Sequence, residues 1–127
     1  MKPTDLESLT TSDLVKRFAA TGIEEDKAEQ TQNQKKRNNL RLHMFAIAKE
    51  LKRRPGDHRR ALSQLYDHPN MEVRLLAAKC ALAIDFDRAR QLIEEIAGSR
   101  CYPQAGDAGM CLTMLDRKIF FAGIDGS

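Results

Sequence analysis

The stretch that most constrains the fold of this chain runs from Asp67 to Leu82 and reads DHPNMEVRLLAAKCAL. It combines an acidic turn, a Pro69-Asn70 pair and a run of small apolar residues. An echo begins 34 residues later, where Pro103-Gln104 takes the place of Pro69-Asn70. Four apolar positions recur at the same spacing, with Leu76, Ala77, Cys80 and Ala81 matched by Met110, Cys111, Met114 and Leu115. A period of this length is typical of stacked helical hairpins, so the repeat predicts a helical recognition scaffold without naming its partner.

Apolar residues recur at helical spacing along most of the chain, and no alternating strand pattern of useful length occurs. We therefore expect an all-α stack of about six helices, in which short loops favour antiparallel neighbours. The first helix should begin near Thr11, and the others should cover about 36–53, 58–66, 70–84, 87–97 and 107–116. Asp57 and Asp107 are the expected caps of the third and sixth helices.

At 127 residues the chain is most simply one domain. Within it we expect an N-terminal helical pair at 11–53, two repeat-like hairpins at 57–117 and a C-terminal tail at 118–127. The very polar stretch 24–39 should contain a loop near 31–34, and its sequence leaves open whether the rest is helical.

A net charge of +3 conceals a strongly basic middle segment, because residues 1–34, 35–60 and 61–127 carry −3, +8 and −2. Such a block bears on partners rather than on the fold. Its cations would form one face if the second and third helices pack side by side: Lys35, Lys36, Arg37, Arg41, Lys52, Arg53, Arg54, Arg59 and Arg60. This face would meet solvent, an acidic partner or nucleic acid, although few aromatic residues interleave with the charges to stack on bases.

No arrangement of residues predicts catalysis, a cofactor or a metal site. The three histidines are scattered, and no cysteine lies two to four residues from another, so metal-ligand spacing is missing. We expect Cys80 and Cys111 in the core and Cys101 in a loop. Three cysteines cannot all pair, and Cys80 is expected inside a helix, so we expect a reduced, cytoplasmic protein. The lack of any long apolar run predicts that it has no membrane span.

Three segments together carry a family resemblance: PGDHRRAL at 55–62, LYDHPNMEVRLLAAK at 65–79 and YPQAGDAGM at 102–110. They resemble a bacterial family known only as a domain of unknown function, over about residues 13–119, and the turn at Asp67 is similar to that of HEAT-type repeats. The resemblance implies a small HEAT-like α-α fold and no catalytic residues. Proteins of this type are also similar to immunity proteins of bacterial toxin systems, which implies a toxin as partner.

Two sets of residues are candidates for partner binding. The loop at 99–107 is the sharper one, because Tyr and Arg are favoured at interface hot spots, and its members are Arg100, Tyr102, Gln104 and Asp107. The alternative is that Tyr102 covers the last hairpin while Gly106 and Gly109 allow close helix packing. The second set is acidic and consists of Asp85, Asp87, Glu94 and Glu95.

The turn before residue 70 is expected to be structural. There Asp67 and Arg74 would order the chain through charge-assisted hydrogen bonds beside Pro69. The whole pattern predicts a non-catalytic protein-binding module, with an immunity protein that neutralises a toxin, such as a nuclease, as the leading hypothesis. A nucleic-acid-binding repeat protein that uses residues 35–60 and a general interaction scaffold remain the alternatives.

Overall fold

The computed structural model describes residues 3–117, so the predicted tail at 118–127 lies outside the described residues. The predicted all-α, HEAT-like stack of antiparallel hairpins is confirmed, and residues 3–117 contain no strand. Five α-helices and two 3-10 helices follow one another as η1 (Pro3–Ser8), α1 (Thr11–Gln30), α2 (Gln34–Arg53), η2 (His58–Leu65), α3 (Met71–Ala81), α4 (Phe86–Ala97) and α5 (Gln104–Asp116). All six predicted helices are present, and the third of them is the 3-10 helix η2.

Local capping explains where several helices begin. The side chains of Thr10, Asn33 and Asn70 accept hydrogen bonds from amides in the first turns of α1, α2 and α3. Asp57 caps η2 as predicted, through a bond from the Arg59 amide. The polar stretch 24–39 is helical except for a short turn at 31–33, because α1 continues to Gln30 and α2 starts at Gln34.

The predicted cap at Asp107 is wrong. The α5 helix begins three residues earlier, at Gln104, with Pro103 in the N-cap position. The amide of Asp107 already donates to the Pro103 carbonyl, at 3.1 Å, as part of the helical ladder. A residue whose amide is bonded in this way lies inside the first turn and cannot be the cap.

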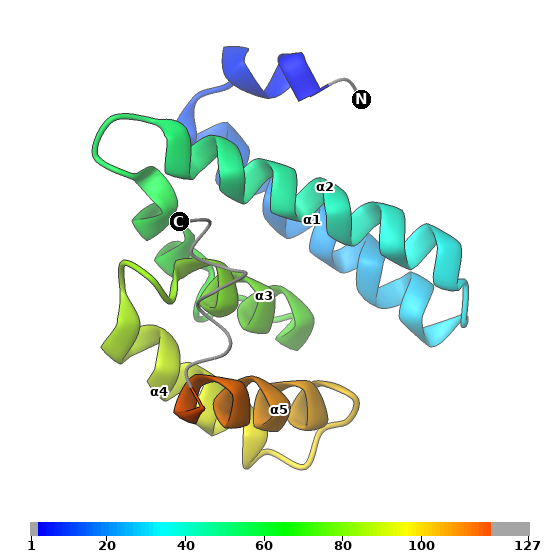
Figure 1. Cartoon of the computed structure of the whole chain (residues 1–127). Helices are drawn as coiled ribbons and strands as arrows, with labels where there is room; N and C mark the ends of the chain where they lie inside the picture. Colours follow the sequence, from blue (N-terminus) through cyan, green and yellow to red (C-terminus); the bar gives the residue numbers. More distant parts are fainter. Residues whose placement is uncertain (1–2, 118–127) are drawn as a thin grey trace.

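The helices stack in antiparallel pairs, with α1 and α2 forming the upper pair in Figure 1 and α4 and α5 the lower pair. Between them lies α3, which packs against η2, α4 and α1. Its buried side chains divide between two apolar clusters. Val73, Leu76, Ala77 and Cys80 belong to the cluster shared with α1, α2 and η2. Leu75 and Ala78, together with Leu82 at the C-cap of α3, belong to the cluster shared with α4 and α5. A helix that is apolar on nearly all sides is buried, and α3 is the middle layer of the stack.

Candidate functional site

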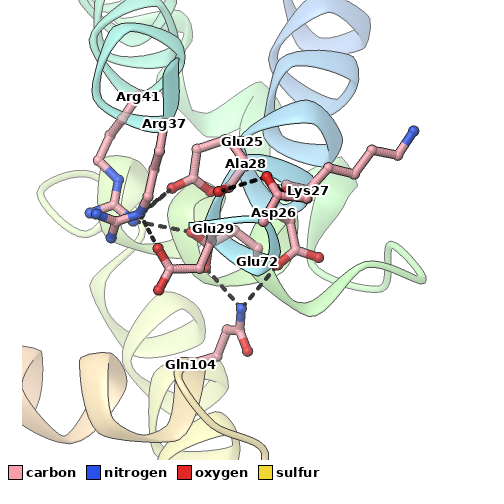
Figure 2. Close-up of polar contacts among 10 residues, drawn as sticks. Glu25, Asp26, Lys27, Ala28, Glu29, Arg37, Arg41, Glu72 and Gln104 are labelled. Atoms are coloured by element: carbon pink, nitrogen blue, oxygen red, sulfur yellow. Dashed lines mark hydrogen bonds and ion pairs between the residues drawn. The ribbon is translucent and has the colours of Figure 1, made fainter. Parts of the chain in front are cut away.

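A cluster of charged side chains lies at the end of the molecule where α1 and α2 meet the starts of α3 and α5 (Figure 2). Its centre is Glu25 of α1, which is completely buried. Nη2 of Arg41, from α2, lies 2.9 Å from Glu25 Oε1 and 3.1 Å from Oε2 of Glu72, in the first turn of α3. Gln104, the first residue of α5, donates from Nε2 to Glu72 Oε1 at 3.3 Å. Four helices therefore meet through one set of polar contacts.

A second layer of partners surrounds this centre. Nε of Arg37 lies 3.4 Å from Glu25 Oε1 and 2.6 Å from Glu29 Oε2. Asp26 accepts hydrogen bonds from Asn70 and from Gln104, at 3.2 Å and 3.4 Å. We call these residues the carboxylate junction, which comprises Glu25, Asp26, Glu29, Arg37, Arg41, Asn70, Glu72 and Gln104.

Burial separates the ionisation of the two central carboxyl groups. Burial, together with a hydrogen bond to Glu72, raises the pKa of Glu25 to about 8 against the pull of Arg41 and Arg37. The pKa of Glu72 is lowered even though burial opposes the shift, because the hydrogen bond from Glu25 and the charge of Arg41 favour the ionised form. Glu25 is sealed from solvent, so this pair holds the helices together rather than presenting a carboxylate to a substrate.

The junction was not predicted from the sequence, although the sequence contains one signal of it. Glu25 falls on the buried stripe of α1, between Phe18 and Ala28 at helical spacing, and all three are buried. A glutamate on the buried face of a helix requires compensating partners, because an unpaired buried charge is costly. Nothing local in the sequence identifies those partners.

The predicted basic patch does not form one free cationic face. Its lysines near 35 and 52 are separated by most of α2, which is about 25 Å of helix. Arg37 and Arg41 belong to the carboxylate junction. Four more arginines form ion pairs. Arg53 and Arg54 pair with Glu50, Arg59 pairs with Asp57, and Arg60 pairs with Asp85. Lys35 and Lys36 line a shallow groove at the start of α2.

The residues of the loop at 99–107 that were expected to bind a partner differ in how deeply their side chains are buried. Gln104 is only 8% exposed and belongs to the carboxylate junction, so it is not available to a partner in this structure. Tyr102 is 73% exposed and therefore does not cover the last hairpin. A side chain at Gly109 would meet nothing within 4 Å, and one at Gly106 would meet only the Tyr102 ring at 3.7 Å. The close-packing alternative for these glycines is thus wrong, while Arg100 is exposed and Asp107 half-buried.

The aromatic loop continues into an exposed apolar stripe on α5. Met110 is 61% exposed and Met114 38% exposed, and both follow Gly106 at intervals of four residues on one side of the helix. We call Tyr102, Met110 and Met114 the α5 face. The 34-residue echo matched the two methionines with buried Leu76 and Cys80 of α3. Their exposure differs because α3 is enclosed by helices, whereas α5 packs mainly on α4.

The acidic candidates are also divided. Asp85 is 8% exposed and accepts the Tyr66 hydroxyl at 3.0 Å, so it is a structural residue. Glu94 is exposed and pairs with Arg90 at 3.2 Å. Asp87 and Glu95 are exposed near opposite ends of α4, so the four do not make one acidic site.

The Asp67 turn is ordered differently from the prediction. Arg74 Nη1 donates to the carbonyl of His68 at 2.7 Å and lies 3.4 Å from that of Pro69, and within residues 3–117 it makes no ion pair with Asp67. Asp67 and Arg74 line a groove of about 360 Å³ between α3 and α4, and Glu95 lines it as well. Glu95, which was expected to bind a partner, therefore lies in the same groove as Asp67 and Arg74, which were expected to be structural.

The cysteine prediction is confirmed, since Cys80 and Cys111 are buried and Cys101 is exposed, all three as free thiols. Among residues 3–117 no three metal-binding side chains converge on a common point. Over the same residues, no helix is both long and apolar enough to cross a membrane.

Comparison with known proteins identifies the family. The crystal structure of protein RPA1889 from Rhodopseudomonas palustris CGA009 is similar, with a TM-score of 0.87 and 48% sequence identity. The match covers 88% of this chain and 93% of that one. No curated protein matches the chain. A family model described as "Domain of unknown function (DUF2019)" matches residues 12–116, close to the span that the sequence resemblance predicted. The chain belongs to the DUF2019 family.

Proposed function

We propose that this protein is a non-catalytic protein-binding module whose docking surface is the α5 face. The observation that carries the proposal is the exposure of three large side chains, Tyr102 just before α5 and Met110 and Met114 on it. In stacked helical proteins the end helices need a polar outer face for solubility, and α5 departs from this rule. Contiguous exposed apolar residues mark interaction sites on soluble proteins.

The chemistry of the α5 face suits a protein partner. A Tyr side chain supplies a large rigid contact with a polar tip, and such residues are enriched among interface hot spots. Methionine is flexible and polarizable, so it adapts to the shape of an opposing surface. Arg100 and Asp107 lie close by in the sequence and supply charges of both signs for the polar rim.

The partner that we propose is a bacterial toxin, which the chain would neutralise by covering its active surface. This finer proposal is supported by the resemblance to immunity proteins, and a nuclease is one candidate. Burial raises the pKa of Glu25, and because this carboxyl group is sealed from solvent we assign it a structural role rather than a catalytic one. Nucleic-acid binding through residues 35–60 has less support, because all six arginines of that segment pair with carboxylates.

The test begins with the tagged chain purified from its native bacterium, in parallel samples with and without nuclease, followed by mass spectrometry. We expect one stoichiometric protein that survives nuclease and whose toxicity in a heterologous host is suppressed by co-expression of this chain. The dissociation constant of the purified pair should rise at least tenfold for Tyr102→Ala, because a hot-spot truncation costs about 2 kcal/mol or more.

The matched control is Leu42→Ala, which removes an apolar side chain that is 65% exposed on α2, remote from α5 in the sequence. It should leave the dissociation constant unchanged. Equal weakening by Tyr102→Ala and Leu42→Ala would contradict the assignment of the α5 face. Recovery of nucleic acid alone, lost on nuclease treatment, would contradict the protein-binding proposal itself.

A further inference from the structure

The carboxylate junction contains more acidic side chains than basic ones. It contains four carboxyl groups, Glu25, Asp26, Glu29 and Glu72, and two guanidinium groups, Arg37 and Arg41. Asp26 and Glu29 are partly exposed, so water screens their charge. Glu25 and Glu72 are buried, and both point an oxygen at the same nitrogen of Arg41. One cation shared by two buried carboxylates leaves a negative charge that is poorly compensated.

The hydrogen bonding of Glu25 indicates how this charge is removed. Its Oε2 atom is buried and makes no hydrogen bond within residues 3–117, while the carboxyl groups of Glu25 and Glu72 converge on one nitrogen of Arg41. An ionised carboxylate has only acceptor atoms, so two carboxyl groups form a hydrogen bond only when one of them carries a proton. The hydroxyl of a protonated Glu25 satisfies both its own buried oxygen and the neighbouring carboxylate.

We propose that Glu25 and Glu72 hold one proton between them, and that this proton fastens the α1–α2 hairpin to the starts of α3 and α5 as a pH-sensitive lock. When the proton is lost, two like charges face each other in a buried space. The contacts that bridge the helices, from Arg41 to Glu72 and from Gln104 to Glu72 and Asp26, then weaken together. The lock is independent of the α5 face and of its partner.

Each element that packs at the junction contributes to its electrostatics. The acids that face Glu25 are Asp26 and Glu29 from α1 and Glu72 from α3, the cations are Arg37 and Arg41 from α2, and the neutral donors are Asn70 and Gln104. Among the other titratable groups, burial and Arg17 lower the pKa of His43, so its effect on stability lies in the acidic range. The pKa of Cys80 and of Cys111 is raised by burial, so their effect lies at alkaline pH.

The sign of the pH dependence follows from the raised pKa of Glu25. The stabilisation is complete below the ordinary pKa of 4.5, where the carboxyl is protonated in both the folded and unfolded states, and it is lost as pH rises through about 8. Between pH 7 and pH 8 the folding equilibrium constant should therefore fall about fivefold because of this one group.

The experiment is urea unfolding of the full chain at several pH values from 7 to 8. We expect the wild type to lose stability over this interval and Glu25→Gln to show almost no change, because the amide keeps the shape without a titratable proton. Glu50→Gln is the matched control. Glu50 is also buried, but hydrogen bonds from Arg53 lower its pKa, so this variant should keep the pH dependence of the wild type. An unchanged pH dependence in Glu25→Gln would overturn the proposal.

A second measurement does not depend on the folding of a variant. Infrared spectroscopy of the wild type with ¹³C-labelled glutamate should show the carbonyl band of a protonated carboxyl group at pH 7 that disappears by pH 9. Hydrogen exchange, corrected for the intrinsic rate at each pH, should accelerate at the first turns of α3 and α5 over the same range. Absence of the carbonyl band of a protonated carboxyl group at pH 7 would contradict the proposal. A purely structural pair would destabilise the protein equally at every pH when substituted.

Discussion

Gly22 lies where α1 approaches both α2 and α3, and its missing side chain sets how closely these helices pack. A Cβ atom built at this position would lie 2.8 Å from Val73 Cγ2 and 2.9 Å from Met44 Cε. The Met44 methyl can move aside because the side chain is flexible. The β-branched Val73 is stiff and belongs to the buried middle helix, so it cannot yield in the same way.

We therefore predict that Gly22→Ala destabilises the protein, by about 1–3 kcal/mol, because overpacking outweighs the gain in helix propensity. Gly109→Ala is the control, since its Cβ meets nothing within 4 Å inside α5. It should stabilise the protein by about 0.5–1 kcal/mol, which is the usual advantage of Ala over Gly in a helix. Urea unfolding of the two variants tests the pair. Similar effects of both substitutions would show that α1 does not approach its neighbours this closely.

At the scale of elements, η1 is attached to the stack by its buried Leu6 and by one polar side chain from the end of α2. Arg54 donates from Nη2 to the carbonyls of Leu9 at 2.6 Å and Leu6 at 3.2 Å, while its Nε bonds Glu50 at 3.0 Å. The planar guanidinium group makes these contacts at once, which an ammonium group cannot do. The residue is thus a link between segments rather than part of a cationic surface.

Arg54→Lys should lower the free energy of unfolding by about 1–3 kcal/mol, since the segment before Thr11 loses several charge-assisted hydrogen bonds. That segment should also become more sensitive to limited proteolysis. Arg53→Lys is the matched control, because Arg53 pairs with the same Glu50 but is exposed, and its interaction with η1 is a charge attraction to Glu7 that a lysine retains. Its stability and proteolysis pattern should resemble those of the wild type. Equal sensitivity of the two variants would argue against the link.

At the scale of the whole molecule, α3 makes the two apolar clusters interdependent. Leu76 is buried in the cluster with α1 and α2, and the adjacent Leu75 is buried in the cluster with α4 and α5. Neither hairpin pair can bury its apolar face without this shared middle helix. Loss of packing on one side of α3 therefore affects both halves of the stack.

Leu75→Ala and Leu76→Ala should each cost about 2–5 kcal/mol, the usual range for a buried leucine. We also expect α1–α2 and α4–α5 to unfold together in both variants. Hydrogen exchange measured at increasing urea concentration tests this expectation. Leu42→Ala, at an exposed position, should leave stability almost unchanged. Separate unfolding of the two hairpin pairs in either core variant would show that α3 does not couple them.

The amino-acid sequence by itself determined the helices, most of their limits and the buried apolar stripes. These features depend on residues three or four positions apart or on a single cap such as Asn70 or Asp57, so they can be recognised locally. The prediction at Asp107 failed because a Pro start without a side-chain cap gives a weaker local signal.

Only the tertiary structure decided which charged side chains are inside. Glu25 meets Arg41 across 16 positions, and Glu72 meets Gln104 across 32, so no local pattern pairs them. The same packing turned Gln104 inward, left Tyr102 exposed and occupied most arginines of the expected basic patch. The physical reason is that a buried charge is tolerated only where other helices bring its partners within hydrogen-bonding distance, and that distance depends on how whole helices pack.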